Sequence, residues 1–343
     1  MVELFSVVKM NKWVEKIVNE KERQALLIMT HPGIEAMGHT TREAVTDGEL
    51  HYEAIKNVMD TYGTSACTVI MDLTVEAEAF GAEVLMPEHE IPNVTGRLVS
   101  DLDSVQRLEI PSLDAARVPE YLKANRLAVQ HTGKPVFSGC IGPFSLAGRL
   151  YDMSEIMIGI YIDTEAVCLL LEKCTRFIID YCKAFKALGA TGVIIAEPAA
   201  GLLSNDDCLE YSTKYVRQIV EAVQDDDFVV ILHNCGNTGQ CTDAMVKTGA
   251  AALHFGNAID MKQALDECPD SILVMGNLNP VGLFKQASPD QVYQETYALL
   301  KATSACRNFV ISSGCDMPPG VPVKNIEAFF RALADYNQEM CYV

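Results

Sequence analysis

Residues 192–197 read GVIIAE and residues 228–233 read FVVILH, with the stretch NDDCLEYSTKYVRQIVEAVQ (205–224) between them. Both short runs are mostly apolar and do not alternate cleanly with polar residues, which is typical of parallel strands buried on both faces. The stretch between them repeats apolar residues at helical spacing and begins with acidic residues, which suit the positive end of a helix dipole. This strand–helix–strand unit predicts an α/β protein.

The same unit recurs along the whole chain. Eight short runs, mostly rich in Val, Ile or Leu, are expected to be strands: ALLIMT (25–30), CTVIMD (67–72), PVFSGC (135–140), GVIIAE (192–197), FVVILH (228–233), AALHFG (251–256), SILVMG (271–276) and NFVISS (308–313). Eight βα units are the number in a (β/α)8 TIM barrel, which is the fold we predict. A doubly wound open sheet is the alternative, but no G-x-G-x-x-G turn follows any of the runs.

Helix signals between the runs agree with this alternation. The stretch 288–303 begins with Ser288 as a predicted N-cap and Pro289 at the first helical position. The stretch 163–189 is amphipathic and is expected to end at Gly189.

The segment 81–101 (GAEVLMPEHEIPNVTGRLVSD) does not fit the alternation, because it combines turn residues with β-formers. We predict a hairpin-like insertion after the second strand. No internal repeat, low-complexity tract or long linker is seen, so residues 1–343 are expected to form a single barrel domain. Residues 1–24 are interpreted as its N-terminal helical extension.

The composition narrows the possible partners and compartments. The chain carries 27 Lys and Arg against 46 Asp and Glu, a formal charge of −19, which argues against nucleic acid and against anionic membrane surfaces. No apolar run approaches the ~20 residues of a membrane span, and the N-terminal residues lack the apolar core of a signal peptide. A cytoplasmic location is therefore expected, where the 12 Cys would remain reduced.

In a barrel, the active groups lie at the C-terminal ends of the strands. Reading just past each predicted strand gives a set of polar candidates: His31, Asp72, Glu76, Cys140, Glu197, His233, Cys235, Asn257, Asn277, Asn279, Cys315 and Asp316. We interpret Asp72, Glu76 and Glu197 as catalytic candidates that orient the substrate or handle its proton, with a structural role as the alternative for each. Asn277 and Asn279 are candidates for cofactor or substrate binding, or for shaping a loop.

The sharpest pattern is HNCGN (233–237) together with SSGCDMPPG (312–320). His233 and Cys235 can point toward one place from a strand end, and Cys315 follows the last strand on the same face. One histidine and two cysteines with an open fourth position form a known catalytic zinc site, and soft thiolates favour zinc over magnesium or calcium. The alternative is a histidine that caps a loop beside two buried thiols.

At these residues the sequence resembles the uroporphyrinogen decarboxylase superfamily, and within it the zinc-dependent methylcobamide:coenzyme M methyltransferases. The resemblance runs nearly end to end. It is carried by GCIGPFSLAGRL (139–150), MGNLNP (275–280), MDLTVEAEAFGAEV (71–84) and the His-x-Cys…Cys pattern above. The first two segments mark only the superfamily, whereas the metal pattern separates its branches.

Two departures from the superfamily patterns matter. Decarboxylases of this superfamily carry an arginine-rich segment near the N-terminus, but here THPGIEAMGHTTREAV (30–45) contains only Arg42. Porphyrinogen decarboxylation is therefore not expected. The coenzyme M enzymes often have an acidic residue after the sixth strand, where we align Asn257. The fourth metal position is thus open between water, Glu197, Glu76 and His254.

The resemblance implies a zinc-dependent methyltransferase that moves a methyl group between a methylated corrinoid and a small thiol acceptor. The corrinoid (methylcobamide) would be bound to a partner corrinoid protein. The sequence alone leaves two other functions open: a lyase or demethylase of the same barrel type, and a non-catalytic corrinoid- or substrate-binding homologue. Arg42, Arg97 and Arg149 are the candidates for holding an anionic group of the acceptor.

Overall fold

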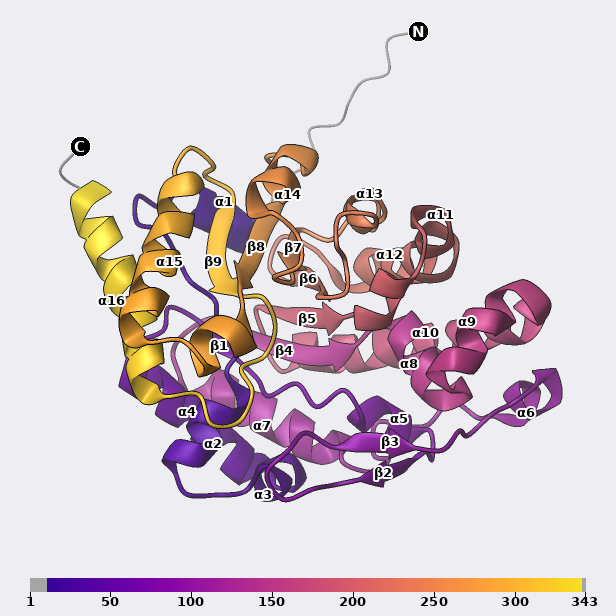
Figure 1. Ribbon diagram of the computed structural model, residues 1–343. Helices are drawn as coiled ribbons and strands as arrows, with labels where there is room; N and C mark the ends of the chain where they lie inside the picture. The colour runs from indigo at the N-terminus through magenta and orange to yellow at the C-terminus, as the bar shows by residue number, and fades with distance from the viewer. Residues whose placement is uncertain (1–10, 341–343) are drawn as a thin grey trace, which may run out of the picture.

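The computed structural model describes residues 11–340, and a curved sheet of seven parallel strands forms its centre (Figure 1). Its neighbours follow the order β1-β4-β5-β6-β7-β8-β9. The strands are β1 (Cys67–Thr68), β4 (Val136–Ile141), β5 (Gly192–Ala196), β6 (Val229–Asn234), β7 (Ala252–Phe255), β8 (Leu273–Leu278) and β9 (Phe309–Ser313). A separate antiparallel pair consists of β2 (Glu83–Leu85) and β3 (Asn93–Thr95).

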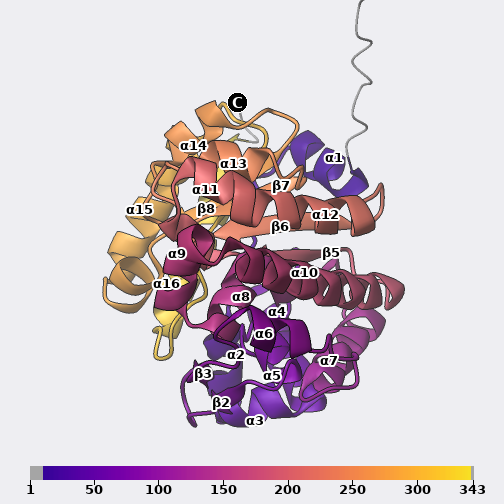
Figure 2. The same ribbon diagram turned by 90° about the vertical axis from the view of Figure 1, so that its right-hand side faces the viewer.

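Helices connect the strands and cover the outside of the sheet (Figures 1 and 2). They are α1 (Lys12–Asn19), α2 (Thr30–Ala36), α3 (Thr41–Thr46), α4 (Gly48–Tyr62), α5 (Val75–Ala79), α6 (Leu102–Arg107), α7 (Val118–His131), α8 (Pro143–Tyr151), α9 (Met153–Ile162), α10 (Thr164–Ala187), the 3-10 helix η1 (Pro198–Leu202), α11 (Asn205–Cys208), the π-helical turn η2 (Leu209–Thr213), α12 (Lys214–Val223), α13 (Thr242–Val246), α14 (Met261–Glu267), the π-helical turn η3 (Pro280–Lys285), α15 (Pro289–Ala302) and α16 (Val323–Met340). No helix in this part of the chain is long and apolar enough to cross a membrane.

The segment before α2 lies in the gap between β9 and β1. Ala25 forms an isolated parallel bridge with Ile311, and the Leu26 amide donates to the Ile311 carbonyl at 3.1 Å. On the other side, the Thr68 hydroxyl donates to the Leu27 carbonyl at 3.1 Å. The segment therefore lies where the eighth strand of a barrel would be, and the predicted barrel fold is confirmed.

Two predicted strands are much shorter than expected. The prediction 25–30 is reduced to the Ala25 bridge, and Thr30 already belongs to α2. The prediction 67–72 is reduced to β1. The reason is that the Ile70 amide donates to Nε2 of the buried His51 side chain at 3.1 Å, so a side chain replaces a strand neighbour there.

Side chains alternate between the inside and the outside of the barrel. Phe137, Ile194, Ile231 and Met275 belong to a buried inner cluster, against which α1 packs with Trp13. The outward residues join a larger cluster that fills the space between the strands and the helices. Since Trp13 and Phe137 meet edge to face at 4.7 Å between ring centres, α1 closes one end of the barrel and leaves the other for chemistry.

The helix predictions are largely confirmed. The stretch 205–224 forms α11, η2 and α12 in succession, and its cap is Ser204, whose hydroxyl accepts from the Asp207 amide at 3.1 Å. Helix α15 begins with the expected Ser288 cap. Helix α10 ends just before Gly189, which has the left-handed φ of 95° that suits glycine.

The predicted insertion at 81–101 contains the antiparallel pair β2–β3. It lies away from the central sheet, beside α5 and α3 (Figure 1). Arg42 of α3 contacts its connecting loop, because its side chain pairs with Glu88 at 2.6 Å.

Candidate metal centre

Three side chains converge at the C-terminal ends of β6 and β9. One donor atom from each of His233, Cys235 and Cys315 lies within 4.8 Å of the others. Across residues 11–340 this is the one group of at least three His, Cys, Asp or Glu side chains close enough to share an ion. The predicted metal ligands are therefore brought together.

Local hydrogen bonds explain how Cys235 reaches this position. Asn234 ends β6 and its side-chain oxygen accepts from the Gly236 amide at 3.0 Å, which turns the chain directly around Cys235. Gly256 lies against that turn, since a Cβ there would come within 2.7 Å of the Cys235 Cα. A side chain at position 256 would push Cys235 away from its two companions.

His233 is held by a second histidine on the neighbouring strand. Strand register places His233 of β6 opposite His254 of β7, and their Nδ1 atoms lie 2.8 Å apart. His254 Nε2 lies 2.9 Å from the Ser312 hydroxyl. Both nitrogens of His254 therefore have partners, whereas His233 Nε2 is buried and has no hydrogen-bond partner among the described residues.

The two thiols differ in acidity. A hydrogen bond from the Cys315 thiol lowers the pKa of Cys235 to about 7, against an ordinary value of 9.0. The same contact raises the pKa of Cys315. The Cys235 thiol therefore loses its proton near neutral pH. The resulting thiolate is the form that binds metals.

Glu197 follows β5, and its carboxylate accepts hydrogen bonds from the first turn of α8. Its carboxylate accepts from the Phe144 amide at 2.6 Å and from the Ser145 amide and hydroxyl at 3.1 and 3.0 Å. A Cβ at Gly142 would lie 2.4 Å from the Glu197 side chain, so glycine is required for this approach. Burial raises the pKa of Glu197 to about 7 despite these donors.

Glu76, on α5, is less fully bonded. Its Oε1 accepts from the Ile141 amide at 3.0 Å, at the end of β4. Its Oε2 is buried and has no partner within the described part of the chain. Burial raises the pKa of Glu76 to about 7, so this carboxyl group exchanges a proton near neutral pH.

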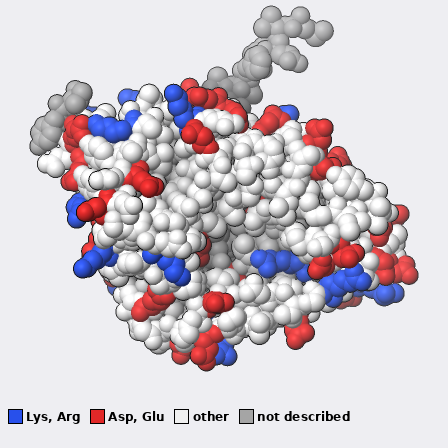
Figure 3. Space-filling model, in the orientation of Figure 1, with Lys and Arg blue, Asp and Glu red and all other residues white. Residues whose placement is uncertain are grey.

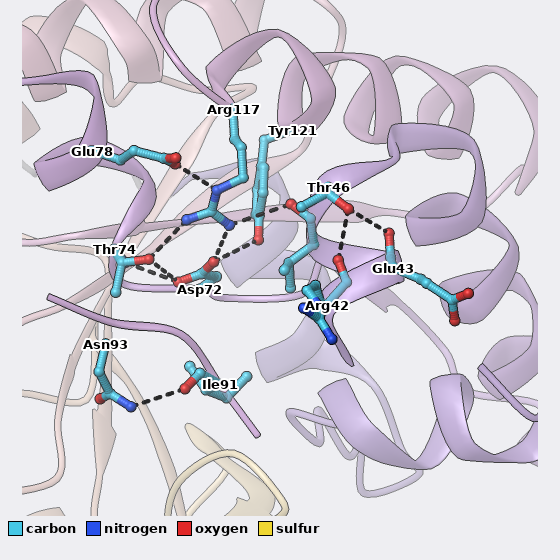
Figure 4. A network of polar contacts seen from close by, with 11 residues as sticks. Arg42, Glu43, Thr46, Asp72, Thr74, Glu78, Ile91, Asn93, Arg117 and Tyr121 are labelled. Carbon is cyan, nitrogen blue, oxygen red and sulfur yellow. Dashed lines mark hydrogen bonds and ion pairs between the residues drawn. The ribbon is translucent and has the colours of Figure 1, made fainter. Parts of the chain in front are cut away.

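Asp72 lies in a buried ion pair that the sequence did not reveal (Figure 4). Arg117, just before α7, pairs with Asp72 through one guanidinium nitrogen and with Glu78 through Nε at 2.5 Å. Asp72 also accepts from the Thr74 amide and hydroxyl at 3.0 and 2.7 Å. These contacts fix the loop between β1 and α5, so the structure favours a supporting role for Asp72.

The two asparagines after β8 hold loops. Asn277 donates to the carbonyls of Gly256 and Ile259 at 3.0 and 2.7 Å, which ties the end of β8 to the loop after β7. Asn279 accepts from the first amides of η3 and caps it. Asn257, aligned with an acidic residue of relatives, is exposed and is not part of the metal-binding group.

The three arginine candidates differ in their partners. Arg42 pairs with Glu88 at 2.6 Å and Arg97 with Glu155 at 3.9 Å. Arg149, on α8, is half-buried and makes no ion pair or hydrogen bond with any other residue between 11 and 340. Burial lowers its pKa, although Asp72 and Glu76 lie within electrostatic range.

Arg149 lines a cavity of about 410 Å³ between α8, α9 and η1. Ser145, which binds Glu197, and Ala199 also line it. The face seen in Figure 3 is hollowed near its centre, with basic side chains at the edge of the hollow. A free guanidinium beside a cavity of this size suits a small anionic ligand.

The fold and the metal-ligand group together define a TIM-barrel protein with a candidate Cys₂His centre. The model of the uroporphyrinogen decarboxylase (URO-D) family matches residues 21–336, and the chain belongs to this family.

Curated relatives include methyltransferases and decarboxylases. The methylcobamide:CoM methyltransferase MtbA of Methanosarcina mazei is 29% identical over 310 residues, which cover 89% of each chain. A uroporphyrinogen decarboxylase of Legionella pneumophila is 27% identical over 311 residues, covering 85% of this chain and 84% of the relative. Overall identity therefore separates the two branches poorly.

A solved structure described as a methyltransferase from Methanosarcina mazei superposes with a TM-score of 0.86. It covers 95% of this chain and 98% of its own length at 23% sequence identity. This match shows that the barrel fold is shared over the whole described chain.

Proposed function

We propose that this protein is a zinc-dependent methyltransferase that moves a methyl group between a methylated corrinoid, carried by a partner protein, and a small thiol acceptor. The observation that carries the proposal is the convergence of His233, Cys235 and Cys315 within 4.8 Å. One imidazole and two thiolates suit zinc, and three protein ligands leave a position for substrate. MtbA, a methylcobamide:CoM methyltransferase, supports the same chemistry as a relative of this chain.

The residues present fit a zinc ion. His233 Nε2 is buried and has no hydrogen-bond partner between residues 11 and 340, and the Cys235 thiol has a lowered pKa. No carboxylate joins the three ligands within the described chain, and both nitrogens of His254 are engaged elsewhere. We therefore assign the fourth position to substrate or water. When bound there, zinc would favour the thiolate form of the acceptor, and two protein thiolates would keep its sulfur electron-rich.

The transfer itself balances without a further oxidant or reductant. The acceptor sulfur forms a bond to the methyl carbon, the cobalt–carbon bond breaks, and its electron pair stays on cobalt as cob(I)alamin. The thiol proton passes to a base. Glu76 is our candidate for that base, because one of its oxygens has no partner in the described part of the chain and its pKa is raised to about 7.

Other residues support the substrate site. Glu197 fixes the first turn of α8 by accepting from its amides, and that helix carries Arg149. We assign Arg149 to an anionic group on the acceptor, since its guanidinium has no partner in the described chain. A porphyrinogen with many carboxylates would need several free cations, but Arg42 and Arg117 are already paired with acidic residues.

The test combines metal content with activity. The purified protein should contain about one zinc, and Cys235→Ala or Cys315→Ala should lose both the metal and the demethylation of methylcobalamin by thiols. Cys306→Ala is the matched control, because Cys306 is a free thiol of similar partial burial outside the group. Full activity of protein that contains no bound metal would overturn the proposal.

A further inference from the structure

We propose that His254 and Ser312 are positioning residues that hold His233 in the tautomer whose Nε2 carries a free lone pair. This inference rests on the proposed function, because it treats His233 as a metal ligand. It concerns three side chains on β6, β7 and β9 that form one continuous chain of hydrogen bonds inside the barrel.

The direction of this chain is fixed at its far end. The Ser312 hydroxyl lies 2.5 Å from the Leu26 carbonyl oxygen, and a carbonyl can only accept, so Ser312 donates its one proton there. The contact between Ser312 and His254 Nε2, at 2.9 Å, must then use a proton on the histidine nitrogen. His254 therefore carries hydrogen on Nε2.

The positions of the other ring protons follow from the proton on His254 Nε2. His254 is fully buried, and a second ring proton would place an unpaired positive charge in the barrel interior, which is costly. Its Nδ1 is thus an acceptor. The contact of 2.8 Å between the two Nδ1 atoms then requires that His233 donates from Nδ1, which in the neutral ring leaves His233 Nε2 without a proton.

The surroundings of His233 Nε2 agree with this assignment. His233 Nε2 is the buried ring atom that has no partner among residues 11–340, and it is the nitrogen left to face Cys235 and Cys315. Metal-binding histidines usually donate their other nitrogen to a fixed acceptor, which sets the tautomer and the orientation of the ring. Here a neutral histidine takes the place of the more usual carboxylate or carbonyl acceptor.

The register of the sheet makes the arrangement possible. His233 pairs directly with His254 across β6 and β7, whereas Ser312 lies beyond β8, on β9. Loss of Ser312 would free His254 to carry its proton on Nδ1, and loss of His254 would leave the Nδ1 proton of His233 without an acceptor. Either change should weaken the lone pair offered to the metal.

The test compares variants that keep or remove the acceptor. In His254→Asn, the side-chain oxygen can stand near the former Nδ1 and still accept from His233, whereas His254→Leu removes the acceptor. We expect zinc affinity, measured by competition with a chelator, to fall about 10- to 100-fold in His254→Leu and about 10-fold in Ser312→Ala. His254→Asn should remain within a few-fold of the parent protein.

The controls separate positioning from general destabilisation. His51→Leu removes another buried histidine, and Ser138→Ala removes another buried hydroxyl, which bonds to Asn125 at 2.6 Å. Both should leave zinc affinity unchanged. Unchanged affinity in folded His254→Leu would overturn the proposal, as would equal losses in the Asn and Leu variants.

A second readout needs no metal. In metal-free protein labelled with ¹⁵N-histidine, long-range proton–nitrogen spectra should show hydrogen on Nδ1 of His233 and on Nε2 of His254. The opposite pattern would refute the assignment. Because this spectrum is recorded without zinc, a correct tautomer in a protein that fails to bind zinc would refute the proposed function and not the hydrogen-bond chain.

Discussion

Replacing Glu76 by glutamine should remove this residue's contribution to the pH dependence of folding stability. Burial raises the pKa of this carboxyl group from 4.5 to about 7 in the folded protein. A raised pKa means that the folded state binds the proton more tightly than the unfolded state. The stability that this group contributes is therefore complete below about pH 4.5 and is lost as the pH rises toward 7.

The size of the effect follows from the two pKa values. Each tenfold change in proton binding corresponds to about 1.4 kcal/mol, so the full difference is about 3 kcal/mol. Between about pH 5 and pH 8, ionisation of Glu76 alone should lower the free energy of unfolding by about 2–3 kcal/mol. Glutamine keeps an oxygen for the Ile141 amide, which lies 3.0 Å from Oε1, and carries no charge at any of these pH values.

The assay is urea unfolding under reducing conditions at several pH values, for the parent protein and for Glu76→Gln. The two should have similar stability near pH 5, and the variant should gain about 2–3 kcal/mol relative to the parent by pH 8. Contributions from other groups, including Glu197 and any bound metal, largely cancel in this difference. Parallel stability curves across this range would refute the reasoning.

Glu83→Gln provides the matched control. Glu83 lies on the nearby β2 strand and is exposed, so its loss changes the net charge equally without removing a buried carboxyl group. It should not reproduce the gain in stability that Glu76→Gln shows at pH 8. A protonated-carboxyl infrared band near pH 6 should be weaker in Glu76→Gln than in the parent, because Glu197, whose pKa is also raised to about 7, keeps its own contribution.

Two further predictions concern the arginines. Arg117→Met should lower the free energy of unfolding by about 3–5 kcal/mol, because it leaves the Asp72 carboxylate buried without its partner. Arg42→Met, which breaks an exposed pair, should change the free energy of unfolding little. Equal losses in the two variants would contradict the assignment. Arg149→Gln should raise KM about 10-fold for 2-mercaptoethanesulfonate, with a smaller change in kcat and in KM for the neutral 2-mercaptoethanol, because it removes one charge-assisted contact. Equal changes in KM for both thiols would show that Arg149 does not bind the anionic group of the acceptor.

The strands were predictable because their signal is local. Runs such as 192–197 and 228–233 are buried on both faces, so the hydrophobic pattern alone identifies β5 and β6. The failures occur where the barrel closes. Residues 25–30 make one bridge, and 67–72 give way to β1 because His51, from a separate helix, takes the Ile70 amide. No pattern within either run contains that information.

The convergence of the three candidate metal ligands was also predictable, for a geometric reason. His233 and Cys235 are close in sequence, and Cys315 follows the strand that ends on the same face. The position of His254 was harder, because sequence order alone allows it to be a ligand. Its actual partners depend on the pairing of β6 with β7 and on Ser312 from β9, and these contacts exist only after the sheet has formed.

Asp72 shows why choosing a residue from its position in the sequence does not give its role. Its position after a strand on the working face predicts chemistry, yet its carboxylate is bound by Arg117, 45 positions later in the chain. That arginine also holds Thr74 and Glu78, at 2.8 and 2.5 Å, so four polar side chains brace the loop that leads into α5. Glu76 is carried on the same short helix. The ion pair therefore holds the helix that presents Glu76 to the end of β4. Glu76 itself keeps a buried oxygen that has no hydrogen-bond partner among residues 11–340.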